Sequence, residues 1–135
     1  MRSRRDDVDV SATVERARRL GLCGFGDVPH DERLVRRIER FADVPAGSLA
    51  WTRDPDGLYW LGRIDGPYFR DTSPEAAAVD LVHVRACQWL SAPLLENDVP
   101  AVVIATFGRG GRNFQQTHDP DAGAESEQIW NANAH

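Results

Sequence analysis

Residues 48–65 read Ser-Leu-Ala-Trp-Thr-Arg-Asp-Pro-Asp-Gly-Leu-Tyr-Trp-Leu-Gly-Arg-Ile-Asp, and this stretch decides the fold class. Two short runs rich in apolar and aromatic residues flank Asp54-Pro-Asp-Gly, a tetrad in which proline and glycine favour a tight turn. The sequence therefore predicts a β-hairpin with strands over 48–53 and 58–65. Gly66-Pro67 is expected to end the second strand before an extended Tyr68-Phe69-Arg70.

More strands are expected after the hairpin. Residues 81–90 alternate apolar with polar side chains, as a strand with one buried face does. The apolar run 101–107 is the best candidate for a central strand. Residues 71–79 read as a loop with a turn of helix, and 124–131 as a short closing helix anchored by Ile129 and Trp130.

Helices are expected before the hairpin. One starts at Ser11, and Gly21, Gly24 and Gly26 are expected to end it in a tight turn. A phosphate-binding interpretation of these glycines is disfavoured, because they follow a helix and not a strand. A second helix starts near Asp31, with an apolar stripe on one face and arginines on the other, namely Leu34, Val35, Ile38 and Phe41 against Arg33, Arg36, Arg37 and Arg40.

Two helices followed by four or five short strands indicate an α+β domain, with a small β-barrel preceded by the two helices. The 135 residues suffice for one domain. Its expected parts are a flexible start (1–10), a helical part (11–47), a barrel part with an arginine- and glycine-containing loop (48–118), and an acidic C-terminal segment (119–135).

The charge pattern narrows the function classes. All sixteen basic residues are arginine, so no lysine is present for a Schiff base, a P-loop or a PD-(D/E)xK nuclease site. The net charge of −5 argues against non-specific coating of nucleic acid. Residues 119–135 hold four acids and no arginine, which leaves the rest nearly neutral and able to form local basic faces.

The expected location is the cytoplasm. No stretch approaches the roughly 18 apolar residues that a membrane-spanning helix needs. Acidic residues follow the basic N-terminus where a signal peptide would have its apolar core. Neither a membrane nor a secretory route is therefore expected.

The sequence contains few residues in patterns that would indicate an active site or a metal site. The His and Cys spacings fit no zinc motif, and Gly-x-Ser-x-Gly is absent. Cys23 with His83 or His118 as base is an alternative, but nothing in the sequence brings these residues together. Cys23 and Cys87 are expected to be small, reduced, buried residues. We therefore expect no enzyme, no metal and no cofactor.

The aromatic residues point towards binding. Several fall on or beside expected strands, where alternate positions of a barrel face inward and can stack on a planar base or a cation. The alternative is that they fill the core, and the sequence does not separate the two. The set is Trp51, Tyr59, Trp60, Tyr68, Phe69 and Trp89.

The loop 108–116 is a second candidate for ligand contact. Glycines separate Arg109 from Arg112, which lets the backbone approach a phosphate. Asn113, Gln115 and Gln116 can bond to polar edges of bases. A solvated connection remains the alternative.

Short motifs carry a resemblance to a known family. They are Gly47-Ser-Leu-Ala-Trp51-Thr-Arg-Asp, Gly57-Leu-Tyr-Trp60-Leu-Gly-Arg-Ile-Asp-Gly-Pro-Tyr68, Val84-Arg85-Ala-Cys-Gln-Trp89 and the earlier Leu22-Cys-Gly-Phe25-Gly26. Together they resemble the N-terminal reader domains of Mrr-type and McrBC-type restriction proteins, which are similar to the PUA-like superfamily of EVE, YTH and ASCH modules. The resemblance covers roughly residues 20–90, with weaker support to about 116.

The resemblance implies recognition of a modified base, flipped out of a duplex into a pocket walled by aromatic side chains. By position the walls are Trp51, Trp60, Tyr68 and Trp89. The backbone contacts are Arg85, the loop residues Arg109 and Arg112, and Gln115. The acidic balance departs from what a DNA reader usually has. With no nuclease domain in this chain, cleavage would need a separate partner nuclease.

Four hypotheses follow. The leading one is a stand-alone reader of modified DNA that serves phage defence in a restriction system. The second keeps the fold and takes RNA as its ligand. The third is a protein-interaction or regulatory domain that docks an acidic partner on the arginine face of the second helix. The fourth is an enzyme that uses Cys23 or carboxylates.

Overall fold

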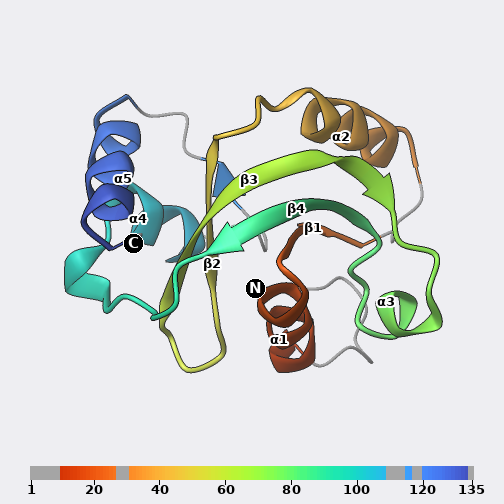
Figure 1. Ribbon diagram of the computed structural model, residues 1–135, viewed down its shortest axis with the longest axis horizontal. Coiled ribbons are helices and arrows are strands. Elements are labelled where there is room, and N and C mark those ends of the chain that lie inside the picture. The colour runs from red at the N-terminus through yellow and green to blue at the C-terminus, as the bar shows by residue number, and fades with distance from the viewer. Residues whose placement is uncertain (1–9, 27–30, 109–114, 117–119, 134–135) are drawn as a thin grey trace.

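An antiparallel β-sheet in the order β1-β4-β3-β2-β5 forms the centre of the computed structural model (Figure 1). The structure describes residues 10–26, 31–108, 115–116 and 120–133. The strands are β1 (Leu22–Phe25), β2 (Leu49–Arg53), β3 (Tyr59–Arg70), β4 (His83–Trp89) and β5 (Gln115–Gln116). Since β1 and β5 are the two edges, the sheet is open. The α+β class is confirmed and the expected barrel is wrong.

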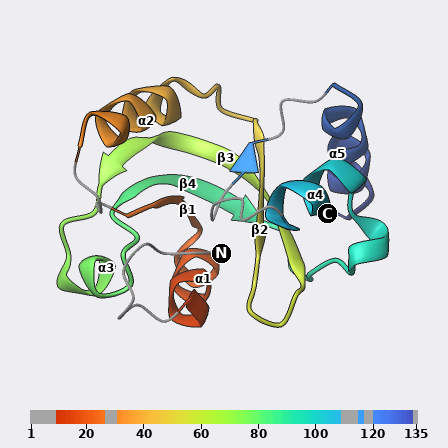
Figure 2. The same cartoon turned by 180° about the vertical axis from the view of Figure 1, so that it is seen from behind.

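Helices surround the sheet at both of its ends (Figures 1 and 2). Next to β1, α1 and α2 cover opposite faces: Ala17 of α1 packs with Leu22 and Val84, whereas Phe41 of α2 packs against Cys23. At the other end, α4 and α5 cover one face of the β2–β3 hairpin and enclose the largest core. The helical bounds are α1 (Val10–Leu20), α2 (Glu32–Asp43), α3 (Pro74–Ala78), the 3-10 turn η1 (Glu96–Asp98), α4 (Ala101–Gly108) and α5 (Pro120–Asn133).

The β2–β3 hairpin has the expected turn and pairing. The Asp54 carboxylate accepts hydrogen bonds from the backbone N–H of Asp56 and Leu58, both at 3.0 Å, and Gly57 takes φ +85°. Arg53 then pairs with Tyr59. One side chain and one glycine thus fix which residues face each other across the two strands.

β3 does not stop at Gly66-Pro67, where a break was expected. It continues to Arg70, and its register against β4 shifts between Ile64 and Tyr68. Proline lacks a backbone N–H, and such an irregularity is one of the few places where a sheet accepts it. The proline therefore marks a bulge within one long strand.

The expected central strand over 101–107 is the helix α4. A continuous apolar run does not distinguish a buried strand from a buried helix, because neither leaves an alternation to detect. In α4 the buried residues are Val103 and Phe107, four positions apart on one helical face, and they pack with Trp51 and Tyr59. The loss of this strand leaves the sheet without the element that would have closed a barrel.

The glycine-rich segment after α1 contains a strand that the sequence did not predict. Gly21 ends the helix with φ +66°, as expected, but residues 22–25 form β1 and all four are buried. A Cβ at Gly24 would lie 1.9 Å from the carbonyl oxygen of His83. This glycine therefore permits close approach of two strands and is not part of a turn.

The remaining helices agree with their sequence signals. α2 starts after Asp31, whose carboxylate accepts from the N–H of Leu34 at 3.1 Å. α5 contains the expected closing helix but starts at Pro120, and its Trp130 is buried while Ile129 packs against the same core. Within the described part of the chain, every helix is too short or too polar to cross a bilayer.

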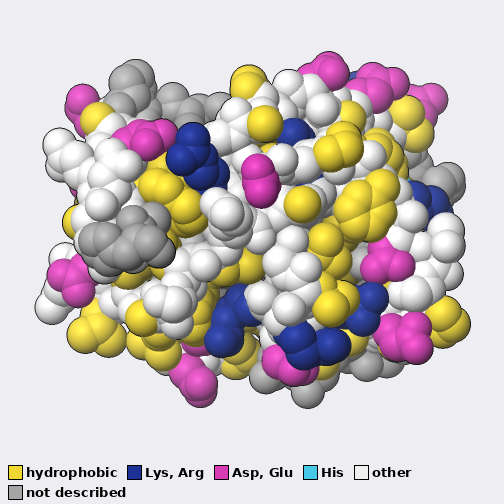
Figure 3. Space-filling model, in the orientation of Figure 1, with side chains coloured by type: hydrophobic (Ala, Val, Ile, Leu, Met, Phe, Trp, Pro, Cys, Tyr) yellow, Lys and Arg dark blue, Asp and Glu magenta, His cyan; other side chains and the backbone are white. Residues whose placement is uncertain are grey.

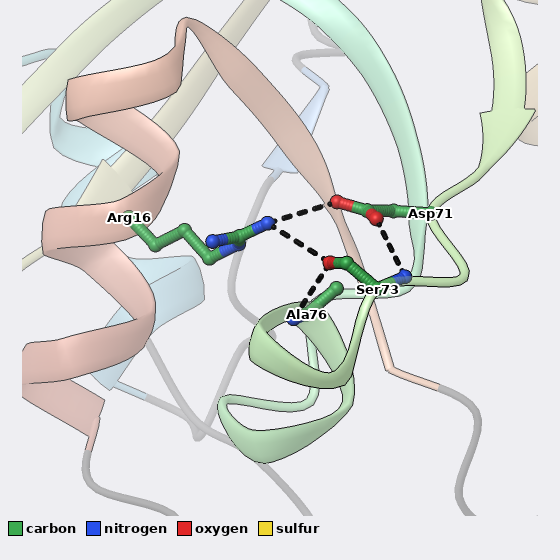
Figure 4. A network of polar contacts seen from close by, with 4 residues as sticks. All are labelled: Arg16, Asp71, Ser73 and Ala76. Carbon is green, nitrogen blue, oxygen red and sulfur yellow. Dashed lines mark hydrogen bonds and ion pairs between the residues drawn. The ribbon is translucent and has the colours of Figure 1, made fainter.

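A small polar network ties α1 to the connection between β3 and α3 (Figure 4). The Arg16 guanidinium donates to Asp71 Oδ2 at 3.1 Å and to Ser73 Oγ at 3.3 Å. The other carboxylate oxygen of Asp71 accepts from the Ser73 N–H at 3.0 Å, and Ser73 Oγ caps α3 through the Ala76 N–H. Burial acts to raise the pKa of Asp71, but the bonds from Ser73 and then Arg16 outweigh it, so this pKa is lowered.

The lowered pKa predicts an acid-sensitive contribution to stability. The folded state favours the ionised Asp71, so this contribution is complete above the ordinary pKa of 3.8 and disappears as pH falls through the lower folded pKa. We expect Asp71→Asn to lower the free energy of unfolding by about 1 kcal/mol at neutral pH. Urea unfolding of both proteins at neutral pH and near pH 3 should show the difference shrinking in acid.

Glu15 provides the matched control for this experiment. It pairs with Arg19 at 3.5 Å through exposed side chains, so Glu15→Gln should change stability by less than about 0.5 kcal/mol at either pH. A difference between wild type and Asp71→Asn that is as large in acid as at neutral pH would contradict the assignment.

Candidate functional site

Two of the four expected pocket aromatics serve the packing of the fold. Trp51 is 0% exposed, and its indole N–H donates to Ser126 Oγ of α5 at 3.1 Å. Tyr68 lies beyond the bulge of β3, where its hydroxyl is 2.8 Å from His83 Nδ1 and its ring stacks on the imidazole. These two residues lie on different faces of the sheet from one another.

The other two, Trp60 and Trp89, share one face of the sheet. Trp89 is paired with Gly62, and Trp60 precedes Gly62 by two residues on the same strand, so both indoles point the same way. A Cβ at Gly62 would lie 2.7 Å from Cε3 of Trp89. The Trp89 ring therefore lies across Gly62, close to Trp60, in space that any larger residue would fill.

Both indoles are anchored by their N–H groups. Trp60 Nε1 donates to Asp54 Oδ2 at 3.0 Å, and Trp89 Nε1 donates to the carbonyl of Leu22 at 3.0 Å. The carboxylate that orders the hairpin turn thus also orients Trp60. With their edges satisfied, the rings can offer only their faces to a ligand.

An arginine lies over one of these faces. The Arg18 guanidinium, from the last turn of α1, is 3.6 Å from the centre of the Trp60 ring, which is 6% exposed. Arg18 itself and its neighbour Arg19 are exposed. In the space-filling view, arginine side chains gather around α1 (Figure 3). The end of α1 therefore brings positive charge to Trp60.

We name this site the tryptophan corner. Its walls are Trp60 and Trp89, its cover is Arg18, and its floor consists of the small side chains on the same face. On β2 those are Ala50, paired with Gly62, and Thr52, paired with Trp60. The floor is flat because Ala50, Thr52 and Gly62 have at most three heavy side-chain atoms each.

Arg85 does not occupy the position of a phosphate contact. It is 4% exposed, and its Nε donates to the Gly66 carbonyl at 2.7 Å while Nη1 donates to the carbonyls of Phe41, at 3.0 Å, and Val44. The guanidinium thus joins the β3 bulge to the C-terminal end of α2. The expected role of Arg85 in binding the nucleic-acid backbone gains no support, because the side chain is buried and its Nε and Nη1 are already bonded.

Most of the loop that was expected to contact phosphate lies outside the residues that the structure describes. Arg109 and Arg112 lie outside the described residues. Gln115 belongs to β5, where its backbone is paired with Trp51 at the edge of the sheet. The role of these three residues in binding stays a prediction.

The two cysteines are enclosed in the sheet. Cys23 and Cys87 are both buried and free. A hydrogen bond with Cys23, and then burial, raise the pKa of the Cys87 thiol far above its ordinary value, so it stays protonated. His83, one of the two bases considered for Cys23, is hydrogen-bonded to Tyr68. Across the described ranges, no three His, Cys, Asp or Glu residues gather in a way that could hold a metal ion.

Sequence reasoning missed four residues of the corner, namely Arg18, Ala50, Thr52 and Gly62. The pairing of Thr52 with Trp60 and of Ala50 with Gly62 follows from the hairpin register, so the turn could have placed Thr52 and Gly62 on the face of Trp60. Arg18 had no comparable signal in the sequence, since a contact between α1 and the hairpin depends on tertiary packing.

Comparisons with protein-family models, with curated proteins and with solved structures found no match to this chain.

Proposed function

We propose that this protein is a non-catalytic nucleic-acid-binding module that holds a base at the tryptophan corner, with modified DNA as its ligand and phage restriction as its role. One observation carries the proposal: two anchored indoles share a face of the sheet, and a guanidinium is stacked on one of them at 3.6 Å. Stacking on an aromatic side chain contributes about 1–3 kcal/mol per base. Two such rings beside small side chains supply ring faces for stacking.

Arg18 occupies the place that a base would take. Its planar guanidinium is weakly hydrated and stacks on aromatic rings as a base does. It is an exposed side chain at a helix end, so a change of rotamer suffices to uncover Trp60. The displaced guanidinium then lies within reach of the phosphate of the incoming nucleotide, with which it forms charge-assisted hydrogen bonds.

The distribution of charge is compatible with a polyanionic ligand in spite of the negative total. Among the described residues that follow β4 there is no arginine, and the acids there are all exposed: Glu96, Asp98, Asp121, Glu125 and Glu127. They lie on η1 and α5. α5 packs on β2, whereas α1 packs on β1, the edge strand at the other end of the sheet. These five acids therefore lie at the end of the sheet away from α1.

The alternatives receive less support. RNA offers the same stacking chemistry, and a binding assay separates it from DNA. On the arginine face of α2, Glu32 and Glu39 are exposed among Arg33, Arg36 and Arg40, so this surface is of mixed charge and matches an acidic partner poorly. A partner nuclease remains part of the proposal for the restriction role.

The test is binding to short fluorescent duplexes with unmodified, methylated, hydroxymethylated or glucosylated bases, and to single-stranded RNA, at about 50 and 200 mM salt. We expect one modified duplex to be preferred at both concentrations. Trp60→Ala and Trp89→Ala should each weaken it by about tenfold or more. Arg18→Ala should weaken all duplexes and reduce the slope of log affinity against log salt by about 1.

Two variants serve as matched controls. Phe69→Ala removes a 44% exposed aromatic from the far end of β3, and Arg40→Ala removes an exposed arginine from α2. Neither should change affinity. The proposal fails if wild-type protein binds nothing at either salt concentration, or if the folded Trp60 and Trp89 variants bind as wild type does. Preference for RNA would show that RNA, and not modified DNA, is the ligand of the tryptophan corner.

A further inference from the structure

Thr52 carries a buried hydroxyl that the fold does not use. The residue is 0% exposed, and Oγ1 has no hydrogen-bond partner among the residues that the structure describes. Other buried hydroxyls are bonded: Thr13 Oγ1 donates to the Val79 carbonyl at 2.9 Å, and Ser126 Oγ donates to the Ala122 carbonyl at 2.7 Å. Thr52 is therefore an exception to the rule that buried polar groups are paired.

The position of this hydroxyl is the floor of the tryptophan corner. Thr52 lies directly across from Trp60 in the antiparallel pair, where opposite side chains project to the same face with Cβ atoms about 5 Å apart. Along that face the next pair is Ala50 and Gly62, and Trp89 lies across Gly62. The unpaired oxygen thus belongs to a residue on the same face of the sheet as the two indoles.

Packing alone gives no reason for threonine here. Valine has nearly the same shape, favours strands as strongly, and would bury no unpaired oxygen. A hydroxyl left unpaired in the apo protein is unfavourable unless a ligand completes its hydrogen bonds. The same oxygen can donate and accept, so it suits the polar edge of a heteroaromatic ring.

We infer that Thr52 Oγ1 hydrogen-bonds the polar edge of the base held at the tryptophan corner and selects among bases by that bond. This inference rests on the proposed function and adds the residue that gives it specificity. Stacking is tolerant of sequence because every base has a ring face, whereas a site with a buried polar group discriminates against ligands that leave it unpaired. The ligand is a nucleobase whose edge, or whose modifying group, presents a donor or acceptor beside Trp60.

The test compares Thr52→Val with Thr52→Ser in binding and in thermal unfolding. Thr52→Val should weaken binding of the preferred duplex by about tenfold and reduce its advantage over unmodified DNA, because the hydrogen bond is lost. Thr52→Ser should retain the preference. The thermal midpoint of Thr52→Val should equal or exceed that of wild type, since no internal bond is removed. Thr13→Val, the matched control, should have a lower midpoint because it loses the bond to Val79.

The outcomes separate the two proposals. If wild type prefers one duplex, Trp60→Ala loses it and Thr52→Val binds like wild type, then the role of Thr52 is refuted and the proposed function stands. A Thr52→Val protein that melts several degrees below wild type also refutes it, since the hydroxyl would then serve the fold. If wild type binds no nucleic acid, the proposed function fails and the inference fails with it.

Discussion

Arg85→Ala is expected to lower the free energy of unfolding by about 3–5 kcal/mol. The guanidinium bonds to three carbonyls that belong to two separate elements, the bulge of β3 and the end of α2. Without this donor the Gly66 and Val44 carbonyls lose the Arg85 bond, and the Phe41 carbonyl keeps the longer bond from the Val44 N–H at 3.4 Å. Urea unfolding followed by tryptophan fluorescence measures the loss.

Two further variants sharpen this prediction. Arg85→Lys keeps the charge but replaces a planar fork by a single ammonium, which cannot reach acceptors on both elements at once, so it should recover only a minor part of the stability. Arg40→Ala, at an exposed site on α2, should stay within about 0.5 kcal/mol of wild type. An Arg85→Ala protein within about 1 kcal/mol of wild type would show that the three bonds do not hold the helix to the bulge.

Gly24→Ala should be the other severe substitution, with a loss of at least about 3 kcal/mol or no folded protein. The added Cβ would lie 1.9 Å from the oxygen and 2.9 Å from the carbon of the His83 carbonyl. Both atoms are backbone, so no side chain can move aside, and β1 must separate from β4. Circular dichroism and urea unfolding, with soluble yield as a first readout, measure the effect.

Gly123 is the matched control for Gly24. It lies inside α5, and a Cβ there would meet nothing within 4 Å. Gly123→Ala should stabilise the protein by about 0.5–1 kcal/mol, since alanine is the better helix former. If the two variants were equally stable, the close approach of β1 and β4 would not exist.

The elements that the sequence predicted well are those with a local physical cause. Asp31 caps α2, and Asp54 with Gly57 forms the hairpin turn, because these side chains bond to backbone within a few residues. The segment 101–107, which was predicted as a strand, has no local signal of this kind in its sequence. Its apolar run fits a buried strand or a buried helix, and only the core around Trp51 and Tyr59 determines that α4 is helical.

The candidate site was predicted in residue type but not in arrangement. Trp51 and Trp60 are on neighbouring strands, yet Trp51 pairs with Leu61 and Trp60 with Thr52, so the two indoles project from opposite faces. The hairpin turn determines this register, so the opposite orientation of the two indoles could have been derived from the position of the turn. The placement of Trp89 on the face of Trp60 depends on the register between β3 and β4, which pairs Trp89 with Gly62 and which no local turn determines.

The exposed arginines at the end of α1 and the exposed acids on η1 and α5 contribute a dipole that runs along the sheet. In the field of a polyanion, a dipole experiences a torque before any contact forms, so under the proposed function α1 would turn to face the strand during approach. A bound molecule then presents its acidic end outward, where it repels a second polyanion. One copy would therefore occupy one stretch of nucleic acid without crosslinking strands, and the pre-orientation would weaken as added salt shortens the range of the field.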